Sequence, residues 1–249
     1  MPIVFAATVA MGVLVGIVGV GGVFLIPLLV WYGFPLETAI GTSLLTFVAA
    51  AAVATIVYAM HGAIDWKAAL LTSAGSAASG VLGAKLSVVL PPAVVTACFA
   101  FFLTVTGITA LTRSDISAVA KRGGGLGPVA LLACGIVAGF GSGLTGVGGN
   151  AVLVPLMLML RADPATAIAV SQPNAIVSSA SGALGHLLFG HIDVRLAATL
   201  AIFCCAGVIV GAVLHRRASA ATLRKIVGVA VLVLAGYLVV KLVLSGEGL

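Results

Sequence analysis

Charged side chains are scarce in this sequence. Asp, Glu, Lys and Arg make up 7% of its 249 residues, whereas 62% of the residues are hydrophobic. A soluble protein carries charge on about a quarter of its residues, and a membrane span needs about 20 mostly apolar residues. Charge-free runs of roughly this length fill the chain, at residues 1–36, 38–60, 68–84, 86–112, 123–160, 164–185, 196–214 and 226–240. The sequence therefore predicts an all-α polytopic membrane protein with about eight hydrophobic segments.

Acidic residues are absent from the interior of these runs. All six lie in predicted loops or at the ends of segments: Glu37, Asp65, Asp115, Asp163, Asp193 and Glu247. No carboxylate is therefore placed to relay protons at mid-membrane depth, and no Lys or Arg is placed to neutralise a buried anion. Any anion that this protein binds must be held by backbone dipoles and neutral donors.

Signatures of catalysis and of bound cofactors are also missing. The chain has no nucleotide-binding loop, no nucleophile paired with a base, no HExxH motif and no histidine pair at metal-ligand spacing. We therefore expect neither an enzyme nor a cofactor or metal, and the net charge of +6, spread over loops, does not indicate nucleic acid as a partner. The four cysteines lie inside apolar runs, where we expect reduced packing residues: Cys98, Cys134, Cys204 and Cys205. The first residues lack a basic n-region, so no cleaved signal peptide is expected.

An internal repeat is the main feature that is present. Gly19-Val20-Gly21-Gly22 returns about 128 residues later as Gly146-Val147-Gly148-Gly149. Further downstream, Gly62-Ala63-Ile64-Asp65 matches Gly190-His191-Ile192-Asp193 with a shift of only one residue. Internal duplication of a membrane-embedded chain, with a glycine-rich break at matching positions, is typical of secondary transporters.

Each repeat is predicted to contain four hydrophobic segments. The first of the four is interrupted by the glycine motif, at residues 3–33 and 127–161. Three uninterrupted segments follow it, at 36–60, 66–88 and 92–112 in the first repeat and at 165–188, 194–215 and 221–244 in the second. A polar, glycine-rich linker joins the repeats. This gives a first membrane repeat at 1–112, a linker at 113–126 and a second membrane repeat at 127–249.

The distribution of basic residues indicates how the interrupted segments lie in the membrane. If all eight segments cross, six basic residues fall on each side. If both interrupted segments are re-entrant hairpins, nine fall on one side and only Lys85, Arg195 and Lys241 on the other, as the positive-inside rule expects. Each repeat then crosses three times, so the two repeats are inverted. We expect both termini outside and the linker in the cytoplasm, in a bacterial inner membrane.

The glycine motifs are the first candidates for a binding site. Glycine lets a ligand approach the main chain closely. A helix that begins after such a turn presents free N–H groups and the positive end of its dipole, which favour an anion. The alternative is close helix packing through small residues, but two copies at matching positions favour binding. The candidate residues are Gly19, Gly21 and Gly22 in the first repeat and Gly146, Gly148, Gly149 and Asn150 in the second.

Polar side chains follow each motif, near the start of the next segment. They are Thr42, Ser43 and Thr46 in the first repeat and Ser171, Gln172 and Asn174 in the second. Polar groups in hydrocarbon need partners, so these side chains should face the interior. They either bind the substrate or hydrogen-bond between helices. His186, late in the same segment, is open to three roles: substrate binding, proton transfer or an interhelical hydrogen bond.

A glycine turn followed by a short apolar run and a proline, twice in about 250 residues, resembles the TauE/SafE (sulfite exporter, TSUP) family of membrane transporters. Gly146-Val147-Gly148-Gly149 with Pro155 is close to the family pattern, with Asn150 in place of a frequent further glycine. The first copy is one residue shorter before Pro27. The resemblance covers nearly the whole chain. It implies transport of small sulfur-containing anions such as sulfite, sulfoacetate and other organosulfonates.

The sequence thus favours a secondary transporter that works by alternating access, with the substrate between the two glycine turns. The expected partners are a small anion and the lipid bilayer, and a homo-oligomer is compatible with the sequence. Two alternatives stay open. One is an anion channel or facilitator with the same site, and the other is a non-transporting accessory membrane protein.

Overall fold

Helices make up all of the regular structure in the computed structural model, which describes residues 2–18, 22–112, 126–215 and 220–245. They are α1 (Pro2–Val18), the 3₁₀ turn η1 (Gly22–Phe24), α2 (Leu25–Trp31), α3 (Leu36–Met60), α4 (Trp66–Val89), α5 (Pro92–Thr112), α6 (Pro128–Thr145), α7 (Gly149–Met159), α8 (Pro164–Phe189), α9 (Val194–His215) and α10 (Ala220–Ser245). The predicted all-α class is confirmed. Each of the six uninterrupted segments coincides with one helix to within one residue at each end.

Aspartates set the starts of three helices. Asp65 precedes α4, Asp163 precedes α8 and Asp193 precedes α9. Each accepts a hydrogen bond from the backbone N–H three residues later, at 3.1, 2.9 and 2.9 Å. Such N-caps satisfy N–H groups that have no partner within the helix. Half of the few acidic residues therefore mark where a polar joint ends and an apolar helix begins.

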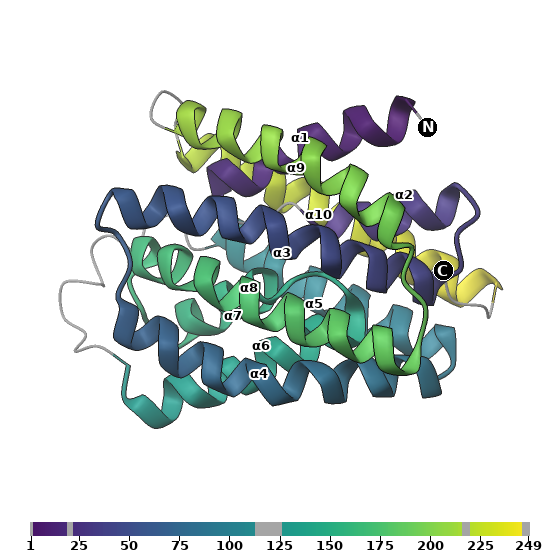
Figure 1. Cartoon of the computed structure of the whole chain (residues 1–249), viewed down its shortest axis with the longest axis horizontal. Coiled ribbons are helices and arrows are strands. Elements are labelled where there is room, and N and C mark those ends of the chain that lie inside the picture. Colours follow the sequence, from purple (N-terminus) through teal and green to yellow (C-terminus); the bar gives the residue numbers. More distant parts are fainter. Residues whose placement is uncertain (1, 19–21, 113–125, 216–219, 246–249) are drawn as a thin grey trace.

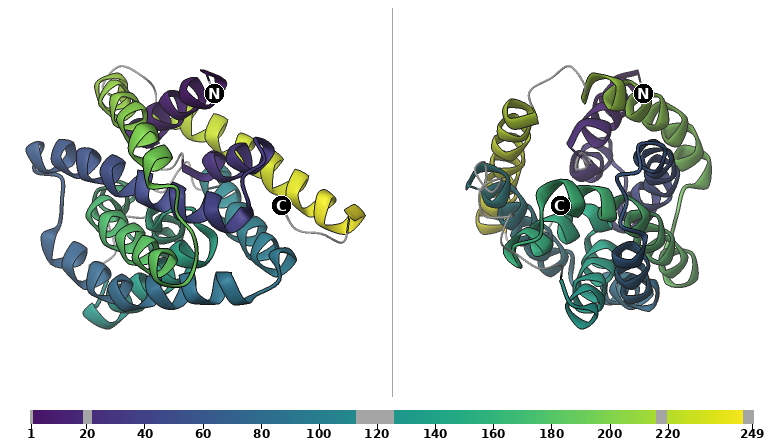
Figure 2. Two further views of the ribbon diagram at one scale, coloured as in Figure 1. Left: turned by 45° about the vertical axis from the view of Figure 1, so that its right-hand side comes forward. Right: turned by 90° about the vertical axis from the view of Figure 1, so that its left-hand side faces the viewer.

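The two halves of the chain, α1 to α5 and α6 to α10, interlock. α1 lies along α9, and α6 lies along α4, so the first helix of each half packs on a helix of the other half. α3 and α8 contact each other across the middle, and α5 pairs with α10 (Figures 1 and 2). α1 begins and α10 ends at the right-hand end of the bundle in Figure 1, whereas α6 begins at the left-hand end.

Small residues bring α6 close to α4. A Cβ at Gly135 would collide with the Thr72 carbonyl, and a Cβ at Gly143 would collide with the Gly80 carbonyl. Both contacts advance by eight residues, so the two helices run in the same direction. Close approach through small residues is a usual way of packing helices in membranes. Packing glycines are thus present in this fold, within regular helices.

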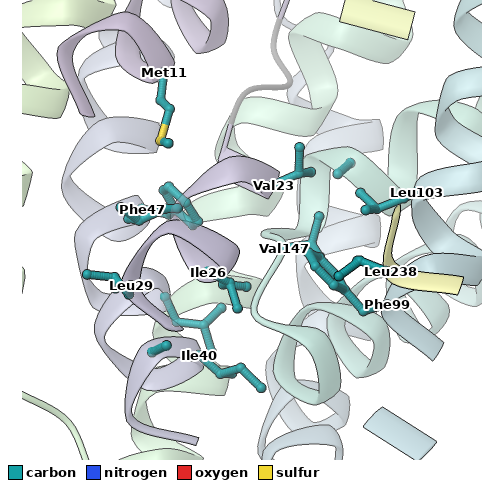
Figure 3. Packing of buried hydrophobic residues seen from close by; sticks show 14 of the residues in the cluster. Met11, Val23, Ile26, Leu29, Ile40, Phe47, Phe99, Leu103, Val147 and Leu238 are labelled. Atoms are coloured by element: carbon teal, nitrogen blue, oxygen red, sulfur yellow. The ribbon is translucent and has the colours of Figure 1, made fainter. Parts of the chain in front are cut away.

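The apolar core lies where the two interrupted segments meet. Val23 and Ile26 come from the first segment, and Val147 comes from the second. They pack with Phe47 of α3 and Phe99 of α5, and all five side chains are buried (Figure 3). The core therefore brings both glycine-containing segments to the centre of the bundle.

Four helical segments among the described residues are long and apolar enough to cross a membrane: Leu36–Met60, Pro92–Thr109, Pro128–Thr145 and Val194–Gly211. α4 and α8 have the length, with 24 and 26 residues, but their many Ser, Thr and Gly residues make them less apolar. Those small and polar residues lie largely where α4, α6 and α8 contact one another. The chain is a multi-pass helical membrane protein.

Candidate functional site

The second glycine motif forms a tight turn between α6 and α7. Gly146 and Gly148 have φ angles of 72° and 87°, which residues with a Cβ rarely adopt. The chain folds back here, because a Cβ at Gly141 of α6 would lie 3.2 Å from Val152 Cγ2 of α7. Every residue from 141 to 155 is buried. The N-terminus of α7 therefore lies inside the protein.

Polar side chains of α8 face this buried helix N-terminus. A Cβ at Gly149 would lie 2.9 Å from Asn174 Nδ2 and directly against Ser178 Oγ. A Cβ at Gly148 would lie 4.0 Å from Ser179 Oγ. We call this group of residues the α7 site: Gly148, Gly149, Asn150, Asn174, Ser178 and Ser179.

Two side chains of the α7 site have buried polar atoms without a hydrogen-bond partner. Asn174 and Ser179 are both 0% exposed, yet Asn174 Nδ2 and Ser179 Oγ make no hydrogen bond. Asn174 Oδ1 is occupied, because Ser76 Oγ of α4 lies 2.7 Å from it. Native proteins pair nearly all of their buried polar groups, since an unpaired one is costly. Both atoms are therefore available as hydrogen-bond donors to a polar group.

The charge distribution of the α7 site favours an anion. Its residues carry no formal charge, and the N-terminus of α7, which is the positive end of its dipole, lies against Asn174 and Ser178 of α8. Within the first turn of α7, the Ala151 N–H donates to Asn150 Oδ1 at 3.1 Å. The unpartnered amide N–H₂ and hydroxyl add two neutral donors. In a buried setting such donors interact strongly with a negative charge.

Ser43 lies on the face of α3 that covers the glycine turn. Its neighbours on that face, Ile40 and Phe47, both contact the turn: a Cβ at Gly146 would lie 2.9 Å from Ile40 Cγ2, and one at Gly148 would lie 3.7 Å from Phe47 Cδ2. Ser43 is 0% exposed, and its Oγ has no hydrogen-bond partner. Among the first-half residues predicted for the binding site, Ser43 is the one that resembles Asn174 and Ser179 in having a buried polar atom without a hydrogen-bond partner.

Thr42 and Thr46 lie elsewhere, where α3 meets the start of α9. Thr42 Oγ1 accepts a hydrogen bond from the Asp193 N–H at 3.2 Å. Thr46 Oγ1 donates to the Thr42 carbonyl at 2.9 Å and lies 3.4 Å from the Ala197 carbonyl. The structure therefore does not bring these two predicted residues to the α7 site.

Ser171 and Gln172 bond within their own helix. Ser171 Oγ donates to the Ile168 carbonyl at 2.7 Å, and Gln172 Nε2 lies 3.2 Å from the same atom. Gln172 Oε1 is buried and has no partner. Ser171 lies three residues before Asn174, close to one turn, whereas Gln172 lies two residues before it and therefore on another face of α8.

The structure describes one of the three candidate glycines of the first motif. Gly19 and Gly21 lie outside the described residues, and Gly22 begins η1. The helix that follows does reach the second motif, because a Cβ at Gly146 would lie 2.9 Å from Ile26 Cδ1 of α2. His186 lies further along α8, where its Nε2 atom is 3.3 Å from the Gly143 carbonyl.

Three residues of this region were not predicted from the sequence: Ser76, Ser178 and Ser179. Single serines are common in membrane helices, where they bond back to their own backbone. Ser178 and Ser179 are adjacent in a charge-free segment, which is a signal that could have drawn attention to them. Ser76 carries no such signal, since only the packing of α4 on α8 brings it to Asn174.

A multi-pass helical bundle with a buried helix N-terminus and unpaired neutral donors has the features of a membrane transport protein. Comparison with protein families agrees, because the model of the sulfite exporter TauE/SafE family matches residues 3–238. The chain belongs to this family of membrane transporters.

Three relatives are each 26% identical to this chain and carry names of the same kind. The probable membrane transporter protein YunE of Bacillus subtilis aligns over 262 residues, which cover 93% of this chain and 96% of the relative. The probable membrane transporter protein MJ0441 of Methanocaldococcus jannaschii covers 81% of both chains. The probable membrane transporter protein YdhB of Bacillus subtilis covers 81% of this chain and 85% of its own length. No solved structure matches the chain.

Proposed function

We propose that this protein is a secondary transporter of small sulfur-containing anions such as sulfite, sulfoacetate or other organosulfonates, in a bacterial inner membrane. The description of the family as a sulfite exporter supports this substrate class. The anionic character of the substrate has separate support from the α7 site. A sulfonate or sulfite oxygen accepts hydrogen bonds from N–H and O–H donors, which are the groups left unpaired there.

The observation that carries this proposal is the pair Asn174 Nδ2 and Ser179 Oγ at the buried N-terminus of α7. Fixed neutral donors and a helix dipole can hold an anion without a counter-charge. They also release it more readily than a buried Lys or Arg would, because no ion pair has to be broken. A carrier needs both properties, since each cycle binds and releases the substrate.

Alternating access is the proposed mechanism, with the two halves as inverted repeats. The mutual exchange of partners, α1 on α9 and α6 on α4, supports this arrangement. The α7 site is formed by α7 and α8 of one half, and α3 and α4 of the other half pack against α8. A movement of one half against the other would therefore change how α3 and α4 cover the α7 site.

The test is transport by purified protein in proteoliposomes. We expect saturable uptake of labelled sulfoacetate or sulfite, with counterflow when the vesicles are preloaded with the same anion. Flux without counterflow would favour the alternative of an anion channel or facilitator. Absence of any flux would favour the accessory membrane protein. Transport of a cation or an amine in place of the anion would contradict the argument from the helix dipole.

A further inference from the structure

His186 is a buried titratable group that the α7 site does not use. It lies near the end of α8 and is 0% exposed. Its Nε2 atom is 3.3 Å from the Gly143 carbonyl of α6 and 3.3 Å from Ser87 Oγ of α4. Its Nδ1 atom is buried and has no hydrogen-bond partner. Nε2 of His186 thus links α8 to α4 and α6, and Nδ1 is able to accept a proton.

Glu37 of α3 lies beside the free Nδ1 atom. A Cβ at Gly190 would lie 3.1 Å from His186 Nδ1 and directly against Glu37 Oε1, so these two atoms are near each other. Glu37 Oε1 is also 3.8 Å from Nδ1 of His191, whose side chain is 87% exposed. The side chain of Glu37 is 35% exposed. Exposed His191, partly buried Glu37 and buried His186 therefore form a series of ionisable side chains from the surface into the protein.

Few other charged groups lie near this pair. On α4, the Lys85 ammonium lies 5.6 Å from the centre of the Phe189 ring. In the loop before α9, Asp193 is engaged as the N-cap of that helix. α6 has no charged residue in its sequence. Glu37 is therefore the acidic group best placed to stabilise a protonated His186.

We propose that His186 and Glu37 form a proton-binding site that couples the proton gradient to anion transport. This rests on the proposed transport function. A proton from water at the Glu37 end of the bundle binds to His186 Nδ1, and the imidazolium is stabilised by the Glu37 carboxylate. The pair then changes from one negative charge to none. It regains the negative charge when the proton leaves.

Proton binding and anion binding should favour each other, because protonation removes the negative charge that repels the anion. His186 lies seven residues after Ser179 on α8, which is about 10 Å along the helix. An anion in the α7 site is repelled by the negative pair and not by the neutral one, so the proton raises anion affinity by roughly tenfold. By linkage, the anion favours proton binding to the same degree. This describes symport of a proton with the anion.

The proton site can be tested without a substrate. Nitrogen NMR of protein labelled at histidine should show the His186 imidazole becoming an imidazolium in mildly acidic solution, and its signal is the one that His186→Gln removes from the four histidine signals. In Glu37→Gln the change should require more acidic solution. His61→Gln is the control, because His61 is exposed and lies at the opposite end of α3. A His186 that stays neutral, or one that titrates identically in Glu37→Gln, would overturn the proposal.

Gly190→Ala provides a second route if His186→Gln fails to fold. Gly190 has φ and ψ of −130° and −148°, and an added methyl group would meet Glu37 Oε1 and displace this flexible side chain from His186. It should shift the imidazole titration in the same direction as Glu37→Gln. An unchanged titration in this variant would also count against the pairing.

Coupling itself is measured in proteoliposomes with labelled sulfoacetate. Wild-type protein should accumulate sulfoacetate when the solution outside the vesicles is made acidic. His186→Gln should retain counterflow at equal pH, but its accumulation of sulfoacetate driven by the pH gradient should be at least tenfold lower than that of wild type. Equal accumulation in both proteins, or no effect of the gradient on wild type, would exclude the coupling role while leaving transport intact. Absence of counterflow in wild type would instead refute the proposed function, and the NMR titration would still decide the proton site.

Discussion

Gly149 at the start of α7 touches Ser178 of α8 so closely that there is no space for a side chain between them. A Cβ at Gly149 would overlap Ser178 Oγ and lie 2.8 Å from Ser178 Cβ. This contact presses the N-terminal turn of α7 against the polar face of α8. It explains why a glycine stands at the first helical position of α7, where its backbone must approach another helix.

Gly149→Ala should therefore move α7 away from α8. We expect a loss of about 1–3 kcal/mol in stability, as for other overpacked interiors, together with weaker anion binding. The double variant Gly149→Ala/Ser178→Gly should recover most of both losses, because it removes the atoms that the new methyl group meets. Thermal unfolding in detergent and sulfoacetate titration measure the two effects. Failure of the second substitution to restore either property would show that this contact does not position α7.

Asn174→Ala and Ser179→Ala test the unpaired donors directly. Each should weaken sulfoacetate or sulfite binding by about 1–3 kcal/mol if it donates a buried hydrogen bond to a charged ligand. Ser179→Ala should not lower the unfolding temperature greatly, since Ser179 Oγ bonds to nothing in the protein. Asn174→Ala should lower it more, because it also removes the hydrogen bond from Ser76 Oγ to Asn174 Oδ1. Thr55→Ala is the matched control, because Thr55 also has a buried hydroxyl without a partner but lies eight residues beyond Phe47 on α3. Wild-type affinity in both test variants would remove them from the site.

The sequence predicts the helices of this protein well because their signals are local. Long apolar runs and polar joints locate α3, α4, α5, α8, α9 and α10 to within one residue. The second glycine motif also carries a local signal, and Gly146 and Gly148 have the positive φ angles that favour glycine. These features depend on neighbours in the chain, which a single sequence displays.

The partners of each polar side chain depend on packing, which the sequence does not display. Asn174 and Thr46 occupy matching positions of the repeat, yet Asn174 faces Ser76 and the start of α7, whereas Thr46 bonds to backbone carbonyls. The second repeat has Ser178 and Ser179 where the first has Ala50 and Ala51. The repeat predicts a symmetric site, but the side chains of its second copy supply most of the polar lining.

Gly148 is expected to be required for its backbone conformation. Its φ of 87° is strained for any residue with a Cβ, at a cost of about 1–3 kcal/mol. Gly148→Ala should therefore lower both stability and anion affinity. Gly33→Ala is the control: Gly33 has a φ of 92°, and a Cβ there would meet nothing within 4 Å. The control should lower stability alone, and equal loss of affinity in both variants would mean that strain acts only through the overall fold.

Thr42 is expected to stabilise the start of α9 without contacting the substrate. Thr42→Ala removes the acceptor of the Asp193 N–H, so stability should fall by about 1 kcal/mol, with wild-type affinity for sulfoacetate. Thr42→Ser keeps the hydroxyl and should restore the stability. The two variants are compared by thermal unfolding and by ligand titration. Reduced affinity in Thr42→Ala at unchanged stability would return this residue to the binding site, as the sequence predicted.

The last prediction concerns membrane topology, and it rests on the positions of the basic residues and on the direction of the helices. α1 begins and α10 ends at one end of the bundle, and α6 begins at the other (Figure 1). With nine of twelve basic residues on the side of the linker in the double-hairpin arrangement, the positive-inside rule places that side in the cytoplasm. A reporter fused after Leu249 should therefore be external, and one inserted within residues 113–125 should be cytoplasmic. The Lys67→Gln variant, which removes one basic residue of that side, should keep this orientation, since eight of the remaining eleven still lie there. Reporters on the same side of the membrane would rule out an odd number of crossings in the second repeat and, with it, the inverted arrangement.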